Sequence, residues 1–173
     1  MHDNSLFKDY IKSYNDFPKK GILFRDILPI LEEPKIFRNL ITNMSKKSFF
    51  KDCDCIIAID ARGFIFGTAI ALSIQKPLLV ARKPGKLPGN LIEKSYNLEY
   101  GSNSLSIQEE ALSKYNNFVI VDDLLATGGT VKCVQEILKE LNKVVIGLSV
   151  VVELKELQGS KNFSFPVSSE LSF

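Results

Sequence analysis

The chain has 173 residues and a mass of 19.4 kDa, which is enough for one compact domain with a core, and 45% of its residues are hydrophobic. Its formal net charge of +2 is too small to indicate a nucleic-acid-binding protein, so we expect no nucleic-acid partner. We also expect no membrane insertion and no secretory signal, because no apolar run approaches bilayer length and residues 1–17 carry charges throughout.

Two residue types narrow the possible chemistry. The three cysteines, Cys53, Cys55 and Cys133, fit a reducing compartment better than a disulfide framework, so we expect reduced structural residues in a cytoplasmic protein. The one histidine, His2, stands where we expect a frayed terminus. Catalytic triads, Cys-His pairs and HExxH zinc sites are therefore excluded, and any chemistry must use carboxylates, basic side chains and backbone amides.

The first part of the chain predicts two helices and a short extended piece. Residues 5–14 place apolar side chains on one side of a helix. A turn follows, with an extended piece around Ile22 to Phe24. In residues 33–50, Pro34 stands near a helix start and the following apolar residues recur at helical spacing.

From residue 55 onward, apolar strands alternate with helices. The predicted strands are CIIAID (55–60), PLLVARK (77–83), NFVIVDD (117–123) and a long final strand, VVIGLSVVVEL (144–154). The predicted helices cover residues 63–75 and 130–142. SYNLEY (95–100) and SLSIQ (104–108) flank the turn residues GSN, which predicts a β-hairpin. The alternation predicts a single α/β domain, residues 1–173, with a mostly parallel central sheet and helices on both faces.

Three polar motifs begin at the ends of predicted strands. They are DARG (60–63), RKPGK (82–86) and DDLLATGGT (122–130). Ligands of parallel sheets bind beyond the carboxyl ends of the strands, so the three motifs predict one composite site. Residues 162–173 carry no functional signal, and we expect them to form an edge element or to cover a ligand pocket.

The last motif has the parts of a phosphate site. Backbone N–H groups of residues 127–130 would point inward at the start of a helix, and Gly128 and Gly129 permit the tight backbone. Alone, this loop could equally be a plain turn capped by threonine. Asp122 and Asp123 favour the functional reading, because buried like charges need partners and sugar hydroxyls would supply them. A ribose 5-phosphate would satisfy both the loop and the acids.

The sequence VIVDDLLATGGT resembles the signature of the type I phosphoribosyltransferases, and its DDLLATGGT part is similar to the members that act on adenine. Five other segments agree in order and spacing, so the resemblance runs from about Phe17 to about Gly159. These segments are FPKKGILFRDI, DARGFIFG, RKPGKLPG, SYNLEYG and VVELKELQG.

The resemblance implies transfer of the 5-phosphoribosyl group from phosphoribosyl pyrophosphate to adenine, giving AMP and pyrophosphate in purine salvage. It implies Mg²⁺ as cofactor, held mainly by substrate and water with no certain protein ligand, and a homodimer. It further implies a flexible β-hairpin lid, residues 94–109, and an N-terminal segment, residues 1–33, that contributes to the base pocket.

The resemblance also assigns roles to individual residues. Arg62 would be catalytic and would bind the diphosphate. The other residues assigned to phosphoribosyl pyrophosphate are Arg82, Lys83, Lys86, Asp122, Asp123, Ala126, Thr127, Gly128, Gly129 and Thr130. The family commonly has a non-proline cis peptide before this arginine, here Asp60–Ala61. Taken alone, Arg62 would more simply form a surface salt bridge and residues 82–86 a solvated basic loop.

For the base, the residues that match the family pocket are Leu23, Phe24, Arg25 and Leu154. Glu99 matches the family glutamate with an acid/base role toward the base, although alone it would be an exposed strand residue. Family members that act on 6-oxopurines usually carry aspartate where this chain has Ala126, which disfavours hypoxanthine and guanine. The alternatives are a ligand-sensing regulator of nucleic acids, which usually needs a DNA-binding extension, or an enzyme for another base.

Overall fold

The computed structural model describes residues 5–98 and 101–173. Its elements, in chain order, are α1 (Ser5–Lys8), β1 (Lys12–Asn15), β2 (Leu23–Asp26), η1 (Leu28–Glu32), α2 (Pro34–Ser45), α3 (Phe49–Asp52), β3 (Cys55–Ile59), α4 (Gly63–Ile74), β4 (Leu78–Ala81), β5 (Leu91–Leu98), β6 (Gly101–Gln108), α5 (Glu109–Leu112), β7 (Asn117–Leu125), α6 (Gly129–Glu140), β8 (Val144–Glu153), η2 (Lys155–Leu157), η3 (Gly159–Asn162) and β9 (Val167–Ser172).

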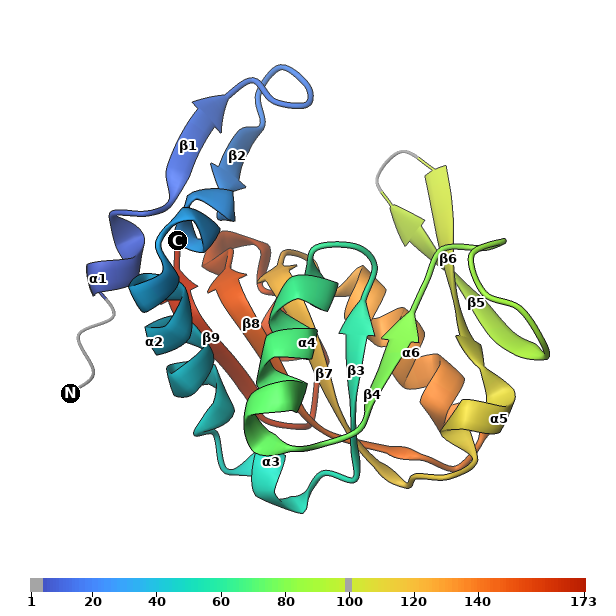
Figure 1. Cartoon of the computed structure of the whole chain (residues 1–173). Helices are drawn as coiled ribbons and strands as arrows, with labels where there is room; N and C mark the ends of the chain where they lie inside the picture. Colours follow the sequence, from blue (N-terminus) through green and yellow to red (C-terminus); the bar gives the residue numbers. More distant parts are fainter. Residues whose placement is uncertain (1–4, 99–100) are drawn as a thin grey trace.

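Five strands form a central parallel sheet in the order β4-β3-β7-β8-β9 (Figure 1). Every residue of β3 is buried, which requires cover on both faces of the sheet. Ile56 belongs to the core shared with α2 and α4, whereas its neighbour Ile57 belongs to the core shared with α6. The predicted fold class, a parallel sheet between two layers of helices, is therefore confirmed.

Two antiparallel hairpins stand apart from this sheet. One is formed by β1 and β2, the other by β5 and β6. Figure 1 shows both hairpins toward the end of the sheet to which its strand arrows point, one on each side. The hairpins therefore flank the edge at which parallel sheets bind ligands.

Three sequence predictions need correction. The helix expected over residues 5–14 ends at Lys8, because the chain then pairs with β2 and this tertiary pairing overrides the local helical spacing. The expected turn GSN lies within β6, since Leu98 already pairs with Gly101. The strand from Val144 is not the last, because β9 follows it.

Strand β9 pairs in parallel with β8 at the sheet edge, so the edge alternative for residues 162–173 is confirmed. Its sequence, VSSELS, lacks the apolar character of the other sheet strands. The buried carboxylate of Glu170 instead lies 2.7 Å from the ammonium group of Lys47. The sequence predicted an edge element here but not a strand, because Glu170 and Ser169 are satisfied by Lys47 and Glu153, which are distant in the sequence.

Helix α4 packs unusually close to β3. A Cβ atom on Gly67 would lie 2.5 Å from the Cβ of Ala58, and one on Gly63 would lie 2.8 Å from Oδ1 of Asp122. Only glycine permits this separation. The close packing brings the first turn of α4 against the end of β7. Within the described residues, no helix has the length and apolar character needed to cross a membrane.

We therefore predict that Gly67→Ala lowers the free energy of unfolding by about 1–3 kcal/mol, because the added methyl group pushes α4 away from β3. Urea denaturation would measure this change. Thr68→Ala, at the exposed neighbouring position of α4, should change stability by less than about 0.5 kcal/mol. Equal effects of the two substitutions would contradict the proposed close packing.

Candidate functional site

A cavity of about 250 Å³ opens at the carboxyl end of β7. It is lined by Arg62, at the start of α4, and by the continuous segment 122–131, which joins the end of β7 to α6. Two of the three motifs that the sequence placed at strand ends therefore meet in one cavity. The third motif approaches through its first residue, Arg82, whose Nε atom lies 3.2 Å from Oδ2 of Asp60.

An ion pair joins the two motifs in the cavity. Nε of Arg62 lies 2.7 Å from Oδ2 of Asp123. The backbone N–H of Asp123 also donates a hydrogen bond of 2.9 Å to Oδ1 of Asp122. Both aspartates are buried, with exposed fractions of 8% and 6%, so the guanidinium compensates a negative charge that would otherwise be costly at this position.

The surroundings of Asp122 affect its proton binding. Burial raises the pKa of Asp122 well above its ordinary value, and the negative charge of Asp123 raises it further. The charge of Arg62 acts in the opposite direction but is a smaller influence. The arrangement thus favours a proton on Asp122 while Asp123 remains paired with the arginine. Such a pair offers both a donor and acceptors to ligand hydroxyl groups.

The loop after the aspartates has the geometry of an anion site. Gly128 has φ 86° and directly precedes α6, whose 12 residues begin at Gly129. Because Gly128 is in the left-handed region, a residue with a side chain would be strained here. The first N–H groups of an α-helix have no partner within the helix, and together with the positive end of the helix dipole they favour a negatively charged ligand at this terminus. Ala126, Thr127 and Thr130 line the same cavity, and their assigned role in binding phosphoribosyl pyrophosphate stays a prediction.

Residues 159–163, which follow β8, pack against the loop 126–128. The sequence did not predict these contacts. Nδ2 of Asn162 donates a hydrogen bond of 2.9 Å to the carbonyl oxygen of Thr127. A Cβ atom on Gly159 would overlap the carbonyl oxygen of Ala126, and a Cβ on Gly128 would lie 3.0 Å from the ring of Phe163. The only sequence signal was the family match that ends near Gly159. Asn162 gave none, because its contact spans 35 residues.

The basic loop after β4 is only partly joined to the cavity. The guanidinium of Arg82 contacts Asp60 and donates a hydrogen bond to the carbonyl oxygen of Lys86 at 3.4 Å. Its Cζ also lies 5.6 Å from the ring centroid of Phe64. Lys83 and Lys86 are exposed and do not line the cavity. The loop therefore presents positive charge beside the cavity rather than inside it.

Two of the residues assigned to the base pocket approach the cavity from different elements. The ring centroid of Phe24, in β2, lies 5.5 Å from Cζ of Arg62. The backbone N–H of Leu154 donates a hydrogen bond of 2.9 Å to the carbonyl oxygen of Leu125, one of the lining residues. Leu23 is 46% exposed. Phe24 and Leu154 therefore each contact a residue that lines the cavity, Arg62 and Leu125 respectively.

Other sequence expectations have mixed outcomes. The Asp60–Ala61 peptide bond is cis, as the family resemblance implied. Glu99 lies outside the described residues, so its assigned role stays a prediction. Cys53, Cys55 and Cys133 are free and buried. Burial raises the pKa of Cys55 to about 12, which fits an unreactive structural thiol.

Comparison with known proteins identifies relatives over nearly the whole chain. Residues 27–170 match the family model described as phosphoribosyl transferase domain. An adenine phosphoribosyltransferase of Prochlorococcus marinus strain MIT 9515 is 58% identical over 171 residues, which is 99% of each chain.

Solved structures that resemble this chain are also adenine phosphoribosyltransferases. The adenine phosphoribosyltransferase of Thermoanaerobacter pseudethanolicus superimposes with a TM-score of 0.92 at 38% identity, covering 98% of this chain and 99% of that one. The Saccharomyces cerevisiae enzyme, solved with adenine and an imino-altritol bisphosphate, superimposes with a TM-score of 0.87 at 33% identity, covering 96% and 97%.

The raised pKa of Asp122 predicts a pH effect on stability. The folded protein holds this proton more tightly than the unfolded chain, so stability should fall as pH rises above the ordinary carboxyl value of 3.8. Asp122→Asn cannot ionise and should lose less stability than the original protein between about pH 5 and about pH 8. Urea denaturation at both pH values would test this, with the exposed Asp9→Asn as control. Equal pH slopes for all three proteins would contradict the assignment.

The support behind the loop predicts a second effect. Asn162→Ala removes the bond to Thr127 and should weaken ribose 5-phosphate binding about threefold to tenfold. Isothermal titration calorimetry would measure the change. Lys161→Ala serves as control, because the Lys161 side chain contacts Gln158 rather than the loop. Unchanged affinity in Asn162→Ala would refute this role.

Proposed function

The chain belongs to the phosphoribosyltransferase family, and we propose that it transfers the 5-phosphoribosyl group from phosphoribosyl pyrophosphate to adenine, giving AMP and pyrophosphate. The observation that carries the proposal is the 2.7 Å ion pair between Arg62 and Asp123, which joins the diphosphate motif to the ribose and phosphate motif within one cavity. The names of the relatives support adenine as the acceptor.

The cavity suggests how the sugar phosphate binds. The 5-phosphate would accept hydrogen bonds from backbone N–H groups of residues 127–130, at the N-terminus of α6. Asp122 and Asp123 would then contact the ribose hydroxyls, with Asp122 able to donate as well as accept. This assignment accounts for two buried acids beside an anion site, since loop and acids bind different parts of one ligand. In the sequence, Ala126 stands between the aspartates and residues 127–130, and it lines the same cavity.

The leaving pyrophosphate needs compensation for its charge. Arg62 would bind its oxygens while its Nε atom remains close to Asp123, because the guanidinium has further donors. Arg82, Lys83 and Lys86 would supply positive charge from the neighbouring loop. Adenine would attack the anomeric carbon as the bond to pyrophosphate breaks. Most of the acceleration would come from positioning and charge stabilisation rather than from covalent catalysis.

The residues of the cavity fit a magnesium ion that enters with the substrate. Oδ2 of Asp123 is already paired with Arg62, and Oδ1 of Asp122 accepts a hydrogen bond from the backbone N–H of Asp123, so both carboxyl groups have partners within the protein. Among residues 5–98 and 101–173, no three acidic, cysteine or histidine side chains are grouped to hold a metal. Mg²⁺ bound to the diphosphate would neutralise charge on the leaving group, with oxygens of the substrate and water as its main ligands.

The base would lie between the hairpin β1–β2 and the end of β8. Phe24 would face one side of the ring and Leu154 the other, with backbone groups of Leu23 and Arg25 reading the ring edge. The N-terminal segment 1–33 would thus complete the base pocket. Ala126 offers no carboxylate for a base proton, which supports adenine over 6-oxopurines.

Further parts of the proposal follow from the family resemblance. Hairpin residues 94–109 would act as a lid that excludes water, with Glu99 in an acid/base role toward the base. We infer that the enzyme works as a homodimer in the cytoplasm and serves purine salvage. A ligand-sensing regulator is the alternative, but the net charge of +2 gives it no support.

Product formation tests the proposal directly. Purified protein with phosphoribosyl pyrophosphate and Mg²⁺ should convert adenine to AMP and give little product from hypoxanthine, guanine, xanthine or uracil. Chromatography of the parallel reactions would measure this. Tight binding of the sugar diphosphate without product from any base would favour the sensor, and product from an oxopurine would overturn the use of Ala126.

The ribose assignment predicts the effect of removing both acids. The variant carrying Asp122→Ala and Asp123→Ala should lose about 100-fold or more in kcat/KM, because the ribose hydroxyls lose their partners. Circular dichroism would check that the fold survives. Undiminished turnover in a folded variant would refute the assignment.

A further inference from the structure

The residue that follows β9, Phe173, is hydrogen-bonded on both sides of Leu154. Its backbone N–H donates a hydrogen bond of 3.0 Å to the carbonyl oxygen of Glu153, and its carbonyl oxygen accepts one of 2.8 Å from the N–H of Lys155. The backbone of Phe173 thus continues the pairing of β9 with β8 past the end of both strands. Leu154, which lies between the two partners, is held in place by residue 173.

The ring of Phe173 reaches a second element, the hairpin β1–β2. Cζ of Arg25, in β2, lies 4.2 Å from the ring centroid, which is a close cation–π contact. Nη1 of the same guanidinium donates a hydrogen bond of 2.6 Å to Oγ of Ser13, the residue paired with Arg25 in β1. The ammonium group of Lys8 lies 5.9 Å from the ring. The guanidinium is therefore fixed between β1 and the end of β9.

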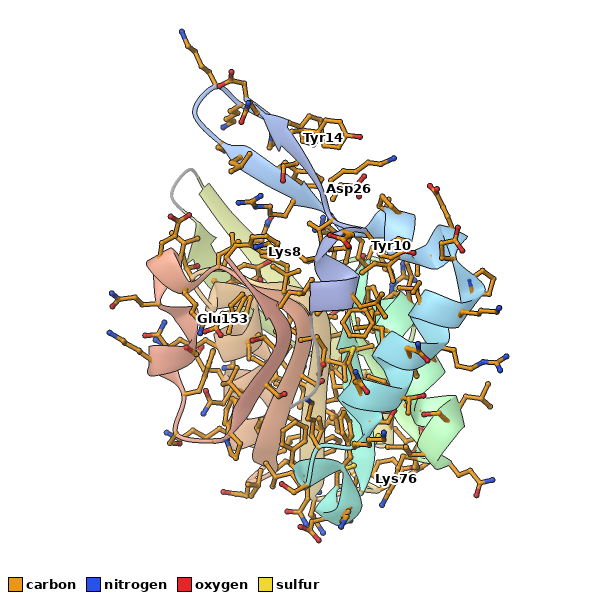
Figure 2. All side chains as sticks on the ribbon, turned by 90° about the vertical axis from the view of Figure 1, so that its left-hand side faces the viewer. Lys8, Tyr10, Tyr14, Asp26, Lys76 and Glu153 are labelled. Carbon is orange, nitrogen blue, oxygen red and sulfur yellow. The ribbon has the colours of Figure 1, made fainter. Side chains whose placement is uncertain are left out.

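These contacts join segments that are far apart in the sequence. Figure 2, which looks onto this side of the molecule, shows Lys8 below the hairpin and Glu153 below Lys8, at the end of the sheet. Within the described part of the chain, β1 and β2 pair with each other and with no strand of the central sheet. The contact between Arg25 and Phe173 is one of those that fix the position of the hairpin, together with the buried residues Phe7 and Ile27 before and after it.

We propose that Phe173 is a positioning residue that holds the two walls of the base pocket at a fixed separation. Its backbone fixes the wall that contains Leu154, and its ring fixes the wall that contains Phe24 through the neighbouring Arg25. The inference rests on the proposed function, because it requires a base between these walls. It assigns Phe173 to recognition of the base and not of the phosphoribosyl group.

A second contact explains why the effect should be selective. Phe24, which directly precedes Arg25 in the sequence, contacts the guanidinium of Arg62. Arg62 is held by Asp123, independently of Phe173. Removing the ring of Phe173 therefore frees one anchor of β2 and leaves the ion pair and the phosphate loop intact. The base should lose affinity while the sugar phosphate keeps it.

Two ligands separate these contributions, because AMP carries the base and ribose 5-phosphate does not. Isothermal titration calorimetry with Phe173→Leu should show AMP binding weakened about threefold to tenfold, with ribose 5-phosphate binding unchanged. The KM for adenine should rise by a similar factor, with kcat and the KM for phosphoribosyl pyrophosphate unchanged. Phe173→Tyr keeps the aromatic face and should bind AMP within about twofold of the original protein.

Two further variants complete the test. Ser172→Ala, at the exposed neighbouring position, is the matched control and should change neither affinity. Arg25→Gln removes the cation and should reproduce the selective loss, and combining it with Phe173→Leu should add little, because both act on one contact. Arg25→Gln also keeps the proposal testable if Phe173→Leu does not fold.

The outcomes distinguish this proposal from the proposed function. Equal weakening of AMP and ribose 5-phosphate in Phe173→Leu would indicate a general structural role and overturn the proposal, as would unchanged AMP binding. Both results leave the activity of the original protein untouched. If the original protein forms no AMP, the proposed function fails and the positioning role fails with it.

Discussion

The ion pair between Arg62 and Asp123 is the interaction on which the rest of the site depends. Two adjacent carboxylates are buried at the end of β7, and this arrangement would be unfavourable without a nearby cation. The close packing of α4 on β3, permitted by Gly67, brings Arg62 within 2.7 Å of Asp123. Burial and the negative charge of Asp123 raise the pKa of Asp122. The packing of α4 thus places a cation beside the two buried carboxylates.

The same arginine connects the cavity to the hairpin β1–β2. Phe24 lies against the guanidinium of Arg62, while the next residue, Arg25, contacts Phe173. The hairpin is therefore held by cation–π contacts through two consecutive residues. These contacts relate the proposed base pocket to the phosphate loop. Binding of the base should accordingly depend on the contact between Arg25 and Phe173, and binding of the sugar phosphate on the ion pair between Arg62 and Asp123.

Much of this arrangement could be predicted from the sequence, because the signals were local. Continuous apolar runs predicted the buried strands of the parallel sheet, and the motifs at their ends predicted which loops meet. Arg62 and residues 122–130 were identified in this way. The family resemblance supplied Leu154 and the cis peptide, which the residue pattern could not have predicted.

The features that escaped prediction depend on contacts between distant segments. Strand β1 was taken for helix because its pairing with β2 is a tertiary effect. Residues 162–173 were expected as an edge element but not as a strand, because the buried Glu170 finds its partner, Lys47, in a distant part of the chain. Asn162 and Phe173 carried no signal, since their partners lie in other elements. Side-chain identity becomes informative at such positions only when the fold is known.

A crystal structure of the protein with AMP would test the central claim most directly. The account predicts the phosphate against the backbone of residues 127–130, the ribose hydroxyls at Asp122 and Asp123, and the base between Phe24 and Leu154. The ion pair between Arg62 and Asp123 should remain. A phosphate bound away from the start of α6, or a ribose without contact to either aspartate, would contradict the account.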